Sequence, residues 1–299
     1  MAKVSNEKKV IAVIVTYNRK ELLKECIEAI LDQNYKNCDV LVVDNNSTDG
    51  TYDYIKKLIG KRVIYKNTGA NLGGAGGFNY GIKEAYNLGC DFVWIMDDDC
   101  IVHKDSLIKL LLADERLNGI YGFLSSKVLW KDNSICKMNI PKRTFSKWLK
   151  DFDTNYQQIA MASFVSLFIK SSTIKKYGLP IKEFFIWTDD WEYTRRISRN
   201  EKCYYITDSI VTHKSNNNIG ADISTESGDR LNRFNYLYRN DRVLYRGEGL
   251  KGEFLLRMRL IKHILKVLKS PIKNKKDRIK IIIKATKEGK KFNPLIEKI

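Results

Sequence analysis

Short runs of β-branched and aliphatic residues alternate with amphipathic stretches along the first hundred residues of the chain. These runs predict strands at residues 9–17, 39–45, 62–67 and 91–96. The amphipathic stretches predict helices at residues 19–32, 51–59 and from Gly77 or Phe78 to Gly89. Strands that alternate with helices in this way predict a parallel sheet covered by helices.

The middle of the chain has a less regular pattern. Strand-like segments at residues 119–130 and 159–170 flank a polar segment, residues 131–155. This arrangement favours mixed or antiparallel strands. A helix is expected from Asp189, because the acidic residues of its first turn and the arginines that follow complement the helix dipole. A strand at residues 204–208 and a mobile loop at 214–229 are expected next.

From Leu231 onward the pattern becomes helical. Apolar residues repeat at spacings of 4, 4, 3, 4 and 3 between Leu250 and Leu268, which predicts an amphipathic helix that ends before Pro271. A second basic amphipathic stretch covers residues 275–287. We therefore expect an α/β domain at 1–230 and a basic helical region at 231–299.

The positive charge is concentrated in this last region. The chain carries a net charge of +18, of which residues 251–299 contribute +12 from 16 basic and 4 acidic residues. A basic amphipathic helix suits an anionic membrane surface, whereas the tail has few of the aromatic side chains on which nucleic-acid bases stack. We expect a peripheral membrane contact and no nucleic-acid partner. Packing of the tail on the α/β domain, with its lysines in solvent, is the alternative.

Neither a membrane span nor a secretory leader is expected from the sequence, since no apolar run is long enough and the first ten residues lack a hydrophobic region. This predicts a cytoplasmic protein, at most peripheral on the inner face of the membrane. The six cysteines fall at irregular spacings without a C-x-x-C pair, which argues against a zinc site and a disulfide framework. We expect reduced, mostly buried thiols.

Three consecutive aspartates, Asp97, Asp98 and Asp99, directly follow a predicted buried strand. In an open α/β sheet, ligands gather at the carboxyl ends of the strands. Two carboxylates one residue apart suit Mg²⁺ or Mn²⁺, which prefer oxygen ligands and keep positions free for phosphate oxygens. A solvated acidic turn is the structural alternative.

Three further segments should reach the same edge of the sheet. Residues 16–19 bring polar groups and a cation to the end of the first strand, and Asp44 with Asn45 ends the second. The segment 71–81 has four glycines in five positions, which permits close approach of the backbone to a ligand. It is not a P-loop, because G-K-[ST] is missing, nor a dinucleotide fingerprint, which would follow the first strand.

Taken in order, these motifs resemble a known family. NLGGAGGF, a strand that ends in DDD, the segment WTDDWE and a later isolated histidine resemble the inverting family 2 glycosyltransferases of the GT-A fold, particularly the bacterial galactofuranosyl- and rhamnosyltransferase branch. The resemblance covers residues 10–240. It implies a Rossmann-like mixed sheet flanked by helices, here with a C-terminal helical extension. It also implies a nucleotide-diphosphate sugar donor, a divalent metal and an inverted product.

The resemblance assigns roles to individual residues. Asp97, Asp99 and His213 would hold Mn²⁺ or Mg²⁺, and Asp190 would be the general base beside Asp189. The residues that would bind the donor are Thr16, Asn18, Arg19, Asp44, Asn71, Gly73, Gly74, Gly76, Gly77, Phe78 and Asp98. The residues that would contact the acceptor are Trp187, Trp191 and Glu192. Without the family, His213 is also explained as a surface histidine, the acids as a stabilised helix terminus, and the tryptophans as core residues.

Chemistry alone supports the same reaction. A metal can stabilise the charge on a departing diphosphate, and a carboxylate on the opposite face can deprotonate the acceptor hydroxyl, in one displacement with inversion. A retaining glycosidase would instead place two carboxyls ~5 Å apart and would need no diphosphate site.

We therefore expect an inverting, metal-dependent glycosyltransferase. It would move galactofuranose from UDP-galactofuranose, the donor we favour, to a glycan or lipid-linked glycan in cell-surface polysaccharide synthesis. The alternatives are a rhamnosyltransferase that uses dTDP-rhamnose, a sugar nucleotidyltransferase, and a basic membrane- or nucleic-acid-binding module without catalysis. A nucleotidyltransferase would need a glycine-rich basic loop after the first strand, which TYNRKEL lacks.

Overall fold

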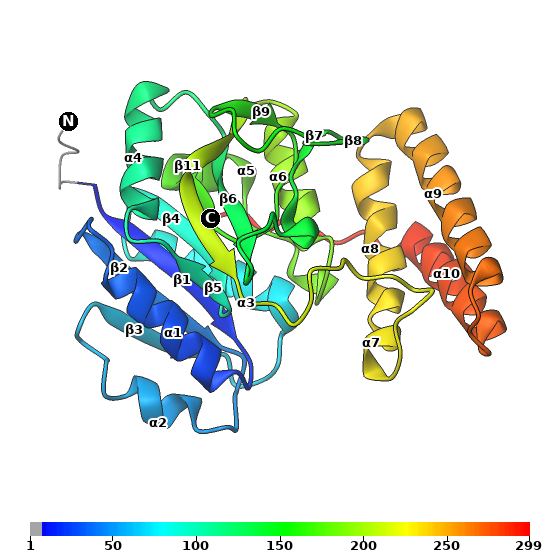
Figure 1. Ribbon diagram of the computed structural model, residues 1–299, viewed down its shortest axis with the longest axis horizontal. Coiled ribbons are helices and arrows are strands. Elements are labelled where there is room, and N and C mark those ends of the chain that lie inside the picture. Colours follow the sequence, from blue (N-terminus) through cyan, green and yellow to red (C-terminus); the bar gives the residue numbers. More distant parts are fainter. Residues whose placement is uncertain (1–7) are drawn as a thin grey trace.

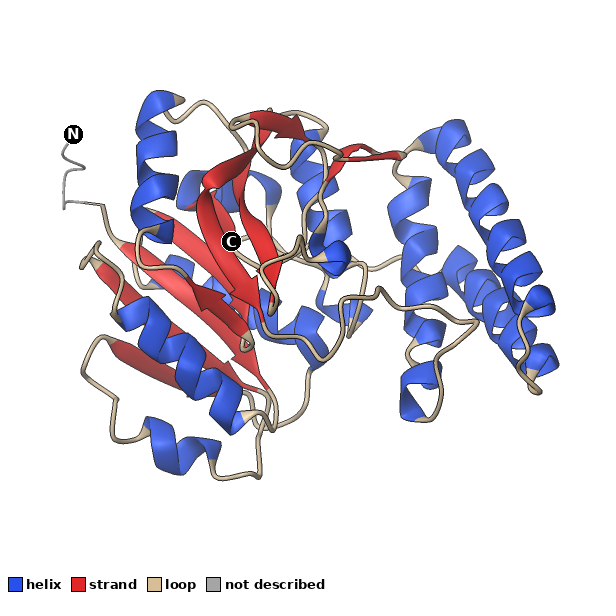
Figure 2. Ribbon diagram, viewed as in Figure 1, coloured by secondary structure: helices blue, strands red, loops and turns tan. Residues whose placement is uncertain are grey.

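A computed structural model describes residues 8–299 of the protein (Figures 1 and 2). At its centre lies a nine-stranded sheet with the order β3-β2-β1-β4-β10-β6-β11-β5, in which β9 also pairs with β11. The expectation that the chain has no secretory leader rests on its first ten residues, most of which lie outside the described range. The strands are β1 (Val10–Thr16), β2 (Cys38–Asp44), β3 (Val63–Asn67), β4 (Phe92–Asp97), β5 (Cys100–Val102), β6 (Phe123–Trp130), β9 (Gln157–Ile159), β10 (Leu167–Lys170) and β11 (Cys203–His213), and the separate hairpin β7 (Lys142–Thr144) and β8 (Lys147–Trp148).

Helices cover both faces of this sheet, and further helices stand beside it (Figure 1). They are α1 (Lys20–Leu31), α2 (Thr51–Ile55), α3 (Gly73–Asn87), α4 (Ser106–Arg116), α5 (Ser171–Tyr177), α6 (Asp189–Ser198), α7 (Asp229–Asn232), α8 (Phe234–Arg246), α9 (Gly249–Lys269) and α10 (Lys275–Lys291), with single 3₁₀ turns η1 (Lys137–Asn139) and η2 (Lys182–Phe184). The predicted helices are confirmed, with ends that differ by a few residues.

The sheet is mixed, as the sequence predicts. Strands β3, β2, β1 and β4 are parallel, and β10 then pairs antiparallel with both β4 and β6. The segment 159–170 forms a strand only at its two ends, so the long strand expected there is wrong. The α/β architecture with a mixed sheet between helices is confirmed.

Strand β1 shows how the hydrophobic pattern builds two cores. All seven of its residues are buried, because helices pack on both faces of the sheet. Its even-numbered residues, such as Ile14, join the core on the side of α1 and α4, and its odd-numbered residues, such as Val13, join the core on the side of α3 and α6. This alternation follows from the period of two along a strand.

Helix α3 begins at Gly73, four residues before the expected start at Gly77. The glycine-rich segment is thus the first turns of the helix rather than a loop. A Cβ atom on Gly77 would lie 2.5 Å from Val15 Cγ1, and one on Gly81 would lie 2.5 Å from Val13 Cγ1. Glycine at these two positions lets the helix pack closely on β1.

The pairing of β5 with β11 carries the far end of the chain to the acidic turn. Strand β11 is twice as long as the expected strand at 204–208, and its last residue, His213, pairs with Cys100 of β5. The Lys214 amide donates to the Asp99 carbonyl at 2.8 Å. Residues more than a hundred positions apart in the sequence therefore meet at one edge of the sheet.

Helices α8, α9 and α10 stand side by side, on the right in Figure 1. They enclose a small core of their own that includes Phe234, Tyr238, Val267 and Ile282.

None of the described helices combines the length and apolar character that crossing a bilayer requires. The chain then returns to the α/β part, where Glu297 pairs with Lys83 of α3 at 2.7 Å and with Lys182 of η2 at 3.0 Å. The domain boundary at residue 230 stays a prediction.

All six cysteines are buried and free, as the sequence predicts. They belong to the cores on both sides of the sheet, where they fill positions as small apolar side chains.

The close packing of α3 on β1 makes a stability prediction. We expect Gly81→Ala to lower the free energy of unfolding by about 1–3 kcal/mol, because its methyl group must displace Val13 and Val43. Gly74→Ala is the matched control in the same helix, since no atom lies within 4 Å of its added Cβ. It should stabilise the protein by about 0.5–1 kcal/mol through helix propensity. Urea unfolding measures both, and equal effects would contradict this account of the packing.

Candidate active site

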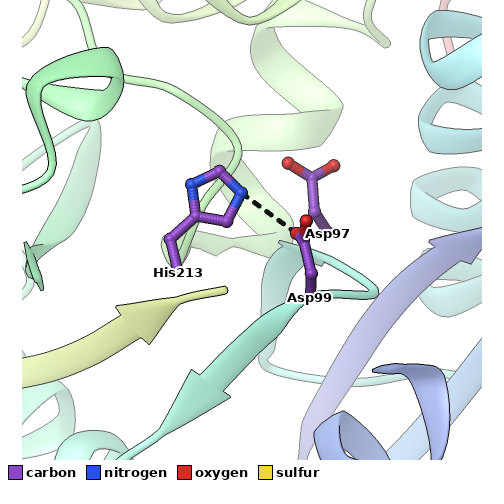
Figure 3. Close-up of side chains that lie close together, drawn as sticks. All are labelled: Asp97, Asp99 and His213. Carbon is purple, nitrogen blue, oxygen red and sulfur yellow. Dashed lines mark ion pairs between the residues drawn. The ribbon is translucent and has the colours of Figure 1, made fainter. Parts of the chain in front are cut away.

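Three side chains converge where β4 ends and β5 begins (Figure 3). Asp97 is the last residue of β4, Asp99 lies in the turn to β5, and His213 is the last residue of β11. Each offers one ligand atom, and these atoms all lie within 4.8 Å of one another. Asp99 and His213 are buried and Asp97 is half-buried. The sheet thus brings together the three residues predicted to bind metal.

The donor set of this cluster fits a divalent cation. The Oδ1 atom of Asp99 is buried, and no described residue provides it with a well-aligned hydrogen bond. Nε2 of His213 lies 3.0 Å from this oxygen in an ion-pair contact. A buried carboxylate oxygen without a hydrogen bond calls for a cation in its vicinity. Carboxylate oxygens combined with one imidazole nitrogen suit a metal such as Mn²⁺.

Asn139, in η1, fixes the orientation of the His213 ring. Its Oδ1 lies 2.8 Å from His213 Nδ1 and accepts from Cys136 Sγ at 3.0 Å, while its Nδ2 donates to Ser163 Oγ at 2.9 Å. With the amide in this orientation, Nδ1 of His213 carries a proton, and in the neutral ring the lone pair lies on Nε2, toward Asp99. Asn139 lies in the polar segment 131–155, where no sequence pattern marked it.

The charges of the cluster are coupled. Burial opposes a charge on His213, but Asp99 outweighs burial and raises the pKa of His213 to about 10. Burial also opposes ionisation of Asp99, yet the contact with His213, helped by Arg19, lowers the pKa of Asp99 to about 2. Burial and the charge of Asp99 raise the pKa of Asp97 to about 6. A metal that binds here must therefore displace a proton from His213.

The first strand-to-helix turn supplies the countercharge. The Arg19 guanidinium donates to Asp98 Oδ1 at 2.7 Å and to Asp99 Oδ2 at 2.9 Å, and the Thr16 hydroxyl donates to Asp98 Oδ2 at 2.8 Å. Burial raises the pKa of Asp98 to about 7, although Arg19 and Thr16 oppose this shift. The structure thus brings Thr16, Arg19 and Asp98 together, and their contact with a donor stays a prediction.

Asn18 and Asp44 hold the turns at the ends of β1 and β2. Asn18 adopts a φ of 53° and its Oδ1 accepts from the Thr48 amide at 2.7 Å. Asp44 is fully buried and accepts from the Ser47 amide at 2.8 Å and from the Tyr65 hydroxyl at 2.7 Å. Both side chains therefore already have protein partners. Their predicted contact with the nucleotide stays a prediction.

The start of α3 contacts the loop that precedes α6. Gly73 has a φ of 70°, and an added Cβ atom would lie 2.1 Å from the Phe185 carbonyl oxygen. That oxygen accepts from the Ala75 amide at 3.1 Å, and the Asn71 Oδ1 accepts from the Gly73 amide at 2.9 Å. Asn45 adds a hydrogen bond to the Gly73 carbonyl at 2.9 Å. The glycine-rich segment therefore links the end of β2 to the acid pair of α6.

Other predicted donor contacts in this segment have packing roles. Phe78 is buried, with its ring centroid 4.9 Å from that of Phe164. An added Cβ on Gly76 would lie 2.7 Å from Leu72 Cβ, and Gly77 packs on β1 as described above. Gly74 has open space where a side chain would be. Among the four glycines, Gly74 is thus best placed to let a ligand approach the backbone.

Asp189 and Asp190 are the first two residues of α6. Burial raises the pKa of Asp189 to about 7, and the charges of Asp97 and Glu192 add to this effect. Burial, the charge of Asp189 and the charge of Asp97 raise the pKa of Asp190 well above its usual value. Because the charge of Asp97 acts on both carboxyls, the acid pair and the metal cluster are close enough to interact electrostatically.

The loop before the acid pair has an unusual backbone. Phe185, Trp187 and Thr188 have φ values of 64°, 65° and 71°. Such conformations cost about 1–3 kcal/mol each in residues other than glycine. Asn240 of α8 holds the loop, because its Nδ2 donates to the carbonyls of residues 184, 186 and 187 at 3.0, 3.2 and 2.9 Å. Asp241 accepts from the Thr188 hydroxyl at 3.2 Å.

The sequence did not single out Asn240 and Asp241. Residues 239–242, RNDR, form a charged and polar run inside an amphipathic helix, which could have marked them. Such a run is also common on a solvent-exposed helix face. Here both side chains are buried. The C-terminal helices therefore help to position the acid pair.

The three residues predicted to contact the acceptor lie in different environments. Trp187 packs edge-on against Phe234 of α8 at a centroid distance of 5.1 Å, which fits a packing role. Both oxygens of Glu192 accept from Arg196, at 3.0 and 2.8 Å. Trp191 packs against Trp148 of the β7–β8 hairpin. Only Trp191 therefore adjoins a partly exposed aromatic surface, and all three acceptor roles stay predictions.

Comparison with known proteins gives a consistent picture. Residues 11–124 match the family described as "Glycosyl transferase family 2". The chain is 26% identical over 261 residues to galactofuranosyltransferase GlfT1 of Mycolicibacterium smegmatis, which covers 81% of this chain and 84% of the relative. It is also 28% identical over 180 residues to the GalNAc(5)-diNAcBac-PP-undecaprenol beta-1,3-glucosyltransferase of Campylobacter jejuni, over 59% of this chain and 54% of the relative.

The fold has close counterparts among solved structures. S. aureus TarS 1-349 in complex with UDP superimposes with a TM-score of 0.57 at 14% identity, over 95% of this chain and 72% of the TarS chain. At this identity the likeness concerns the fold alone, which is the GT-A arrangement that the sequence predicts. The family match over residues 11–124, the relatives and this fold together support a family 2 glycosyltransferase of the GT-A fold.

Proposed function

We propose that this glycosyltransferase moves a sugar from a nucleoside diphosphate to an acceptor hydroxyl with inversion, and that it requires a divalent metal. The observation that carries the proposal is the Asp97–Asp99–His213 cluster at the end of β4, where the charge of Asp97 also acts on the Asp189–Asp190 pair. The first group would hold the metal that stabilises the leaving diphosphate, and the acid pair would deprotonate the incoming alcohol.

At the donor end, Asp97, Asp99 and His213 would hold the metal, which supplies Lewis-acid stabilisation to the departing diphosphate. Mn²⁺ suits the imidazole ligand better than Mg²⁺ does. Arg19 lies at the neighbouring turn between β1 and α1, and its side chain is 39% exposed, so it can approach a phosphate while it neutralises Asp98 and Asp99. Asn139 keeps the His213 ring in the ligand orientation.

At the acceptor end, Asp190 would take the proton of the attacking hydroxyl. Its raised pKa makes it a stronger base than an ordinary carboxylate, provided that it is ionised at the start of the reaction. A cation at Asp97 would oppose the repulsion that Asp97 exerts on the acid pair and so favour this ionised form. Asp189, directly before it, would share the proton as the partner of a coupled pair.

The relatives suggest the substrates. The GlfT1 protein is a galactofuranosyltransferase, which supports UDP-galactofuranose as the donor. The Campylobacter relative carries undecaprenol diphosphate in its name, which supports a lipid-linked glycan as the acceptor in polysaccharide synthesis. A rhamnosyltransferase with dTDP-rhamnose is the second candidate, because the family branch that the sequence resembles includes both galactofuranosyl- and rhamnosyltransferases.

Helix α9 supports a peripheral contact with an anionic membrane. Its predicted apolar stripe faces solvent, with exposed fractions from 48% for Leu265 to 91% for Leu250. The residues of this stripe are Leu250, Phe254, Met258, Ile261, Leu265 and Leu268. Lysines and arginines flank it, so the surface offers apolar contact together with positive charge. Such a contact would place the enzyme on the inner face of the cell membrane.

A nucleotide-release assay tests the proposed reaction. With Mn²⁺ and a panel of acceptors, we expect release from UDP-galactofuranose above that from UDP-galactose, UDP-glucose and dTDP-rhamnose. Chelation of the metal should abolish release. Release from none of these donors, with either Mn²⁺ or Mg²⁺, would contradict the proposal.

The metal cluster predicts a specific loss. We expect His213→Ala to lower turnover on the order of a hundredfold or more, because the metal site loses its nitrogen ligand. His103→Ala is the matched control, since His103 is exposed and bonds only Thr212 among the ring contacts described, at 3.0 Å. Calorimetric Mn²⁺ titration should show weakened binding for His213→Ala alone. Full Mn²⁺ affinity in that variant would exclude His213 as a ligand.

The raised pKa of Asp190 predicts a pH dependence. A base acts only when it is deprotonated, so kcat/KM should rise with pH through an apparent pKa well above that of an ordinary carboxyl group. Asp190→Asn should lower kcat by about 10²–10⁴-fold and remove this limb of the profile. An unchanged profile in the variant would assign the titration to another group.

The exposed stripe predicts binding to anionic vesicles. We expect the double substitution Phe254→Ser and Met258→Ser to weaken binding by about tenfold or more, because both side chains lose apolar contact with the bilayer. Ile120→Ser, which removes an apolar side chain that is 73% exposed on the catalytic side, is the control. Flotation with vesicles that contain phosphatidylglycerol measures this. Equal binding by all three proteins would exclude α9 as the contact.

A further inference from the structure

A cation without a carboxylate partner lies beside the acid pair. Lys142 is in β7, and its Nζ lies 4.9 Å from the ring centroid of Trp148, 5.2 Å from that of Trp191 and 5.8 Å from that of Phe145. Its hydrogen bond is a long one, to the Phe145 carbonyl at 3.4 Å. Within residues 8–299 it forms no ion pair with a carboxylate.

The surroundings of Lys142 connect it to the proposed chemistry. Trp191 directly follows Asp190 in α6, and Trp148 pairs with Lys142 across the β7–β8 hairpin. The two indole rings meet edge to face, with centroids 5.7 Å apart and planes at 87°. Trp148 is 51% exposed, so part of its surface is free to contact a ligand.

The charges around Lys142 leave it short of a counterion. Burial and the charge of Arg259 lower the pKa of Lys142 to about 8, and the charges of Asp241 and Asp190 only partly oppose this. Asp241 forms its ion pair with Arg259, at 2.9 Å, and not with Lys142. A negatively charged ligand group beside Lys142 would provide the partner that the protein does not.

We infer that Lys142, Trp148 and Trp191 form an acceptor subsite that binds an acidic group, phosphate or carboxylate, next to the sugar whose hydroxyl is deprotonated at Asp190. This inference rests on the proposed function and names the class of its acceptor. The ammonium pairs with the acidic group, and the exposed indole of Trp148 packs on a sugar ring. A hydrogen bond to an ionised group strengthens binding more than a neutral one does. The subsite therefore selects acidic acceptors over neutral ones.

The purely structural reading gives a different expectation. Lys142 would then brace the hairpin against α6 through cation–π contacts, which stabilise a protein without any preference among ligands. Its removal would lower the unfolding temperature and affect acidic and neutral acceptors equally. Acceptor binding separates the two readings, because only the subsite depends on the charge of the ligand.

Equilibrium binding with three probes tests the inference. The probes are octyl N-acetylgalactosaminide, which is neutral, N-acetylgalactosamine linked to citronellyl diphosphate, and octyl galacturonide. The wild-type protein with UDP and Mn²⁺ should bind at least one acidic probe about tenfold more tightly than the neutral one. Lys142→Met should remove this preference and leave UDP affinity unchanged, and Lys142→Arg should retain it. A preference for the diphosphate alone, or for the galacturonide alone, identifies the source of the acidic group.

The control variant is Lys147→Met, an exposed lysine on the same hairpin, which should keep the preference. Absence of any preference in the wild-type protein would overturn the inference, as would a preference that survives in Lys142→Met. A lowered unfolding temperature in Lys142→Met with all three affinities changed alike assigns the residue a structural role only. The proposed function fails separately, in the nucleotide-release assay, because these binding measurements require no turnover.

Discussion

Concentrated negative charge at the end of β4 and the start of α6 is the constraint on which the site depends. Five aspartates from two distant segments, residues 97–99 and 189–190, influence one another there. Arg19 and His213 compensate Asp98 and Asp99 directly. The remaining carboxyls have raised pKa values because burial and mutual repulsion disfavour their charge. A divalent cation would relieve this repulsion, which is the physical basis of the proposed metal site.

The acid pair also depends on the C-terminal helices. Three residues with positive φ before α6 would not keep that conformation unaided, and Asn240 bonds three carbonyl groups of the same loop. Asp241 connects the loop to Arg259 of α9. Helix α9 is at the same time the element whose apolar stripe faces solvent. A membrane contact at that stripe would thus be connected to the loop before the acid pair through helix α9 and the side chains of Arg259 and Asp241.

The sequence predicted the parallel half of the fold because its strands are continuous apolar runs between clear helical periods. It placed Asp97 and Asp99 at a strand end and named His213, and the structure brings the three together. The pairing of β5 with β11 could not be predicted, since β5 has three residues and its partner extends past the expected strand. Asn139, Asn240 and Lys142 were missed because each lies in a segment whose polarity is equally typical of a surface.

The glycine-rich segment shows why a motif and its physical role can differ. Its composition favours a flexible loop around a phosphate, yet the structure makes it the start of a helix. Gly77 and the later Gly81 let that helix approach β1, and Gly73 lets it approach Phe185. These two contacts fix the distance between the edge of the sheet and the loop of the acid pair. The segment can therefore influence the proposed donor site by fixing the position of that loop, even where its backbone does not contact the donor.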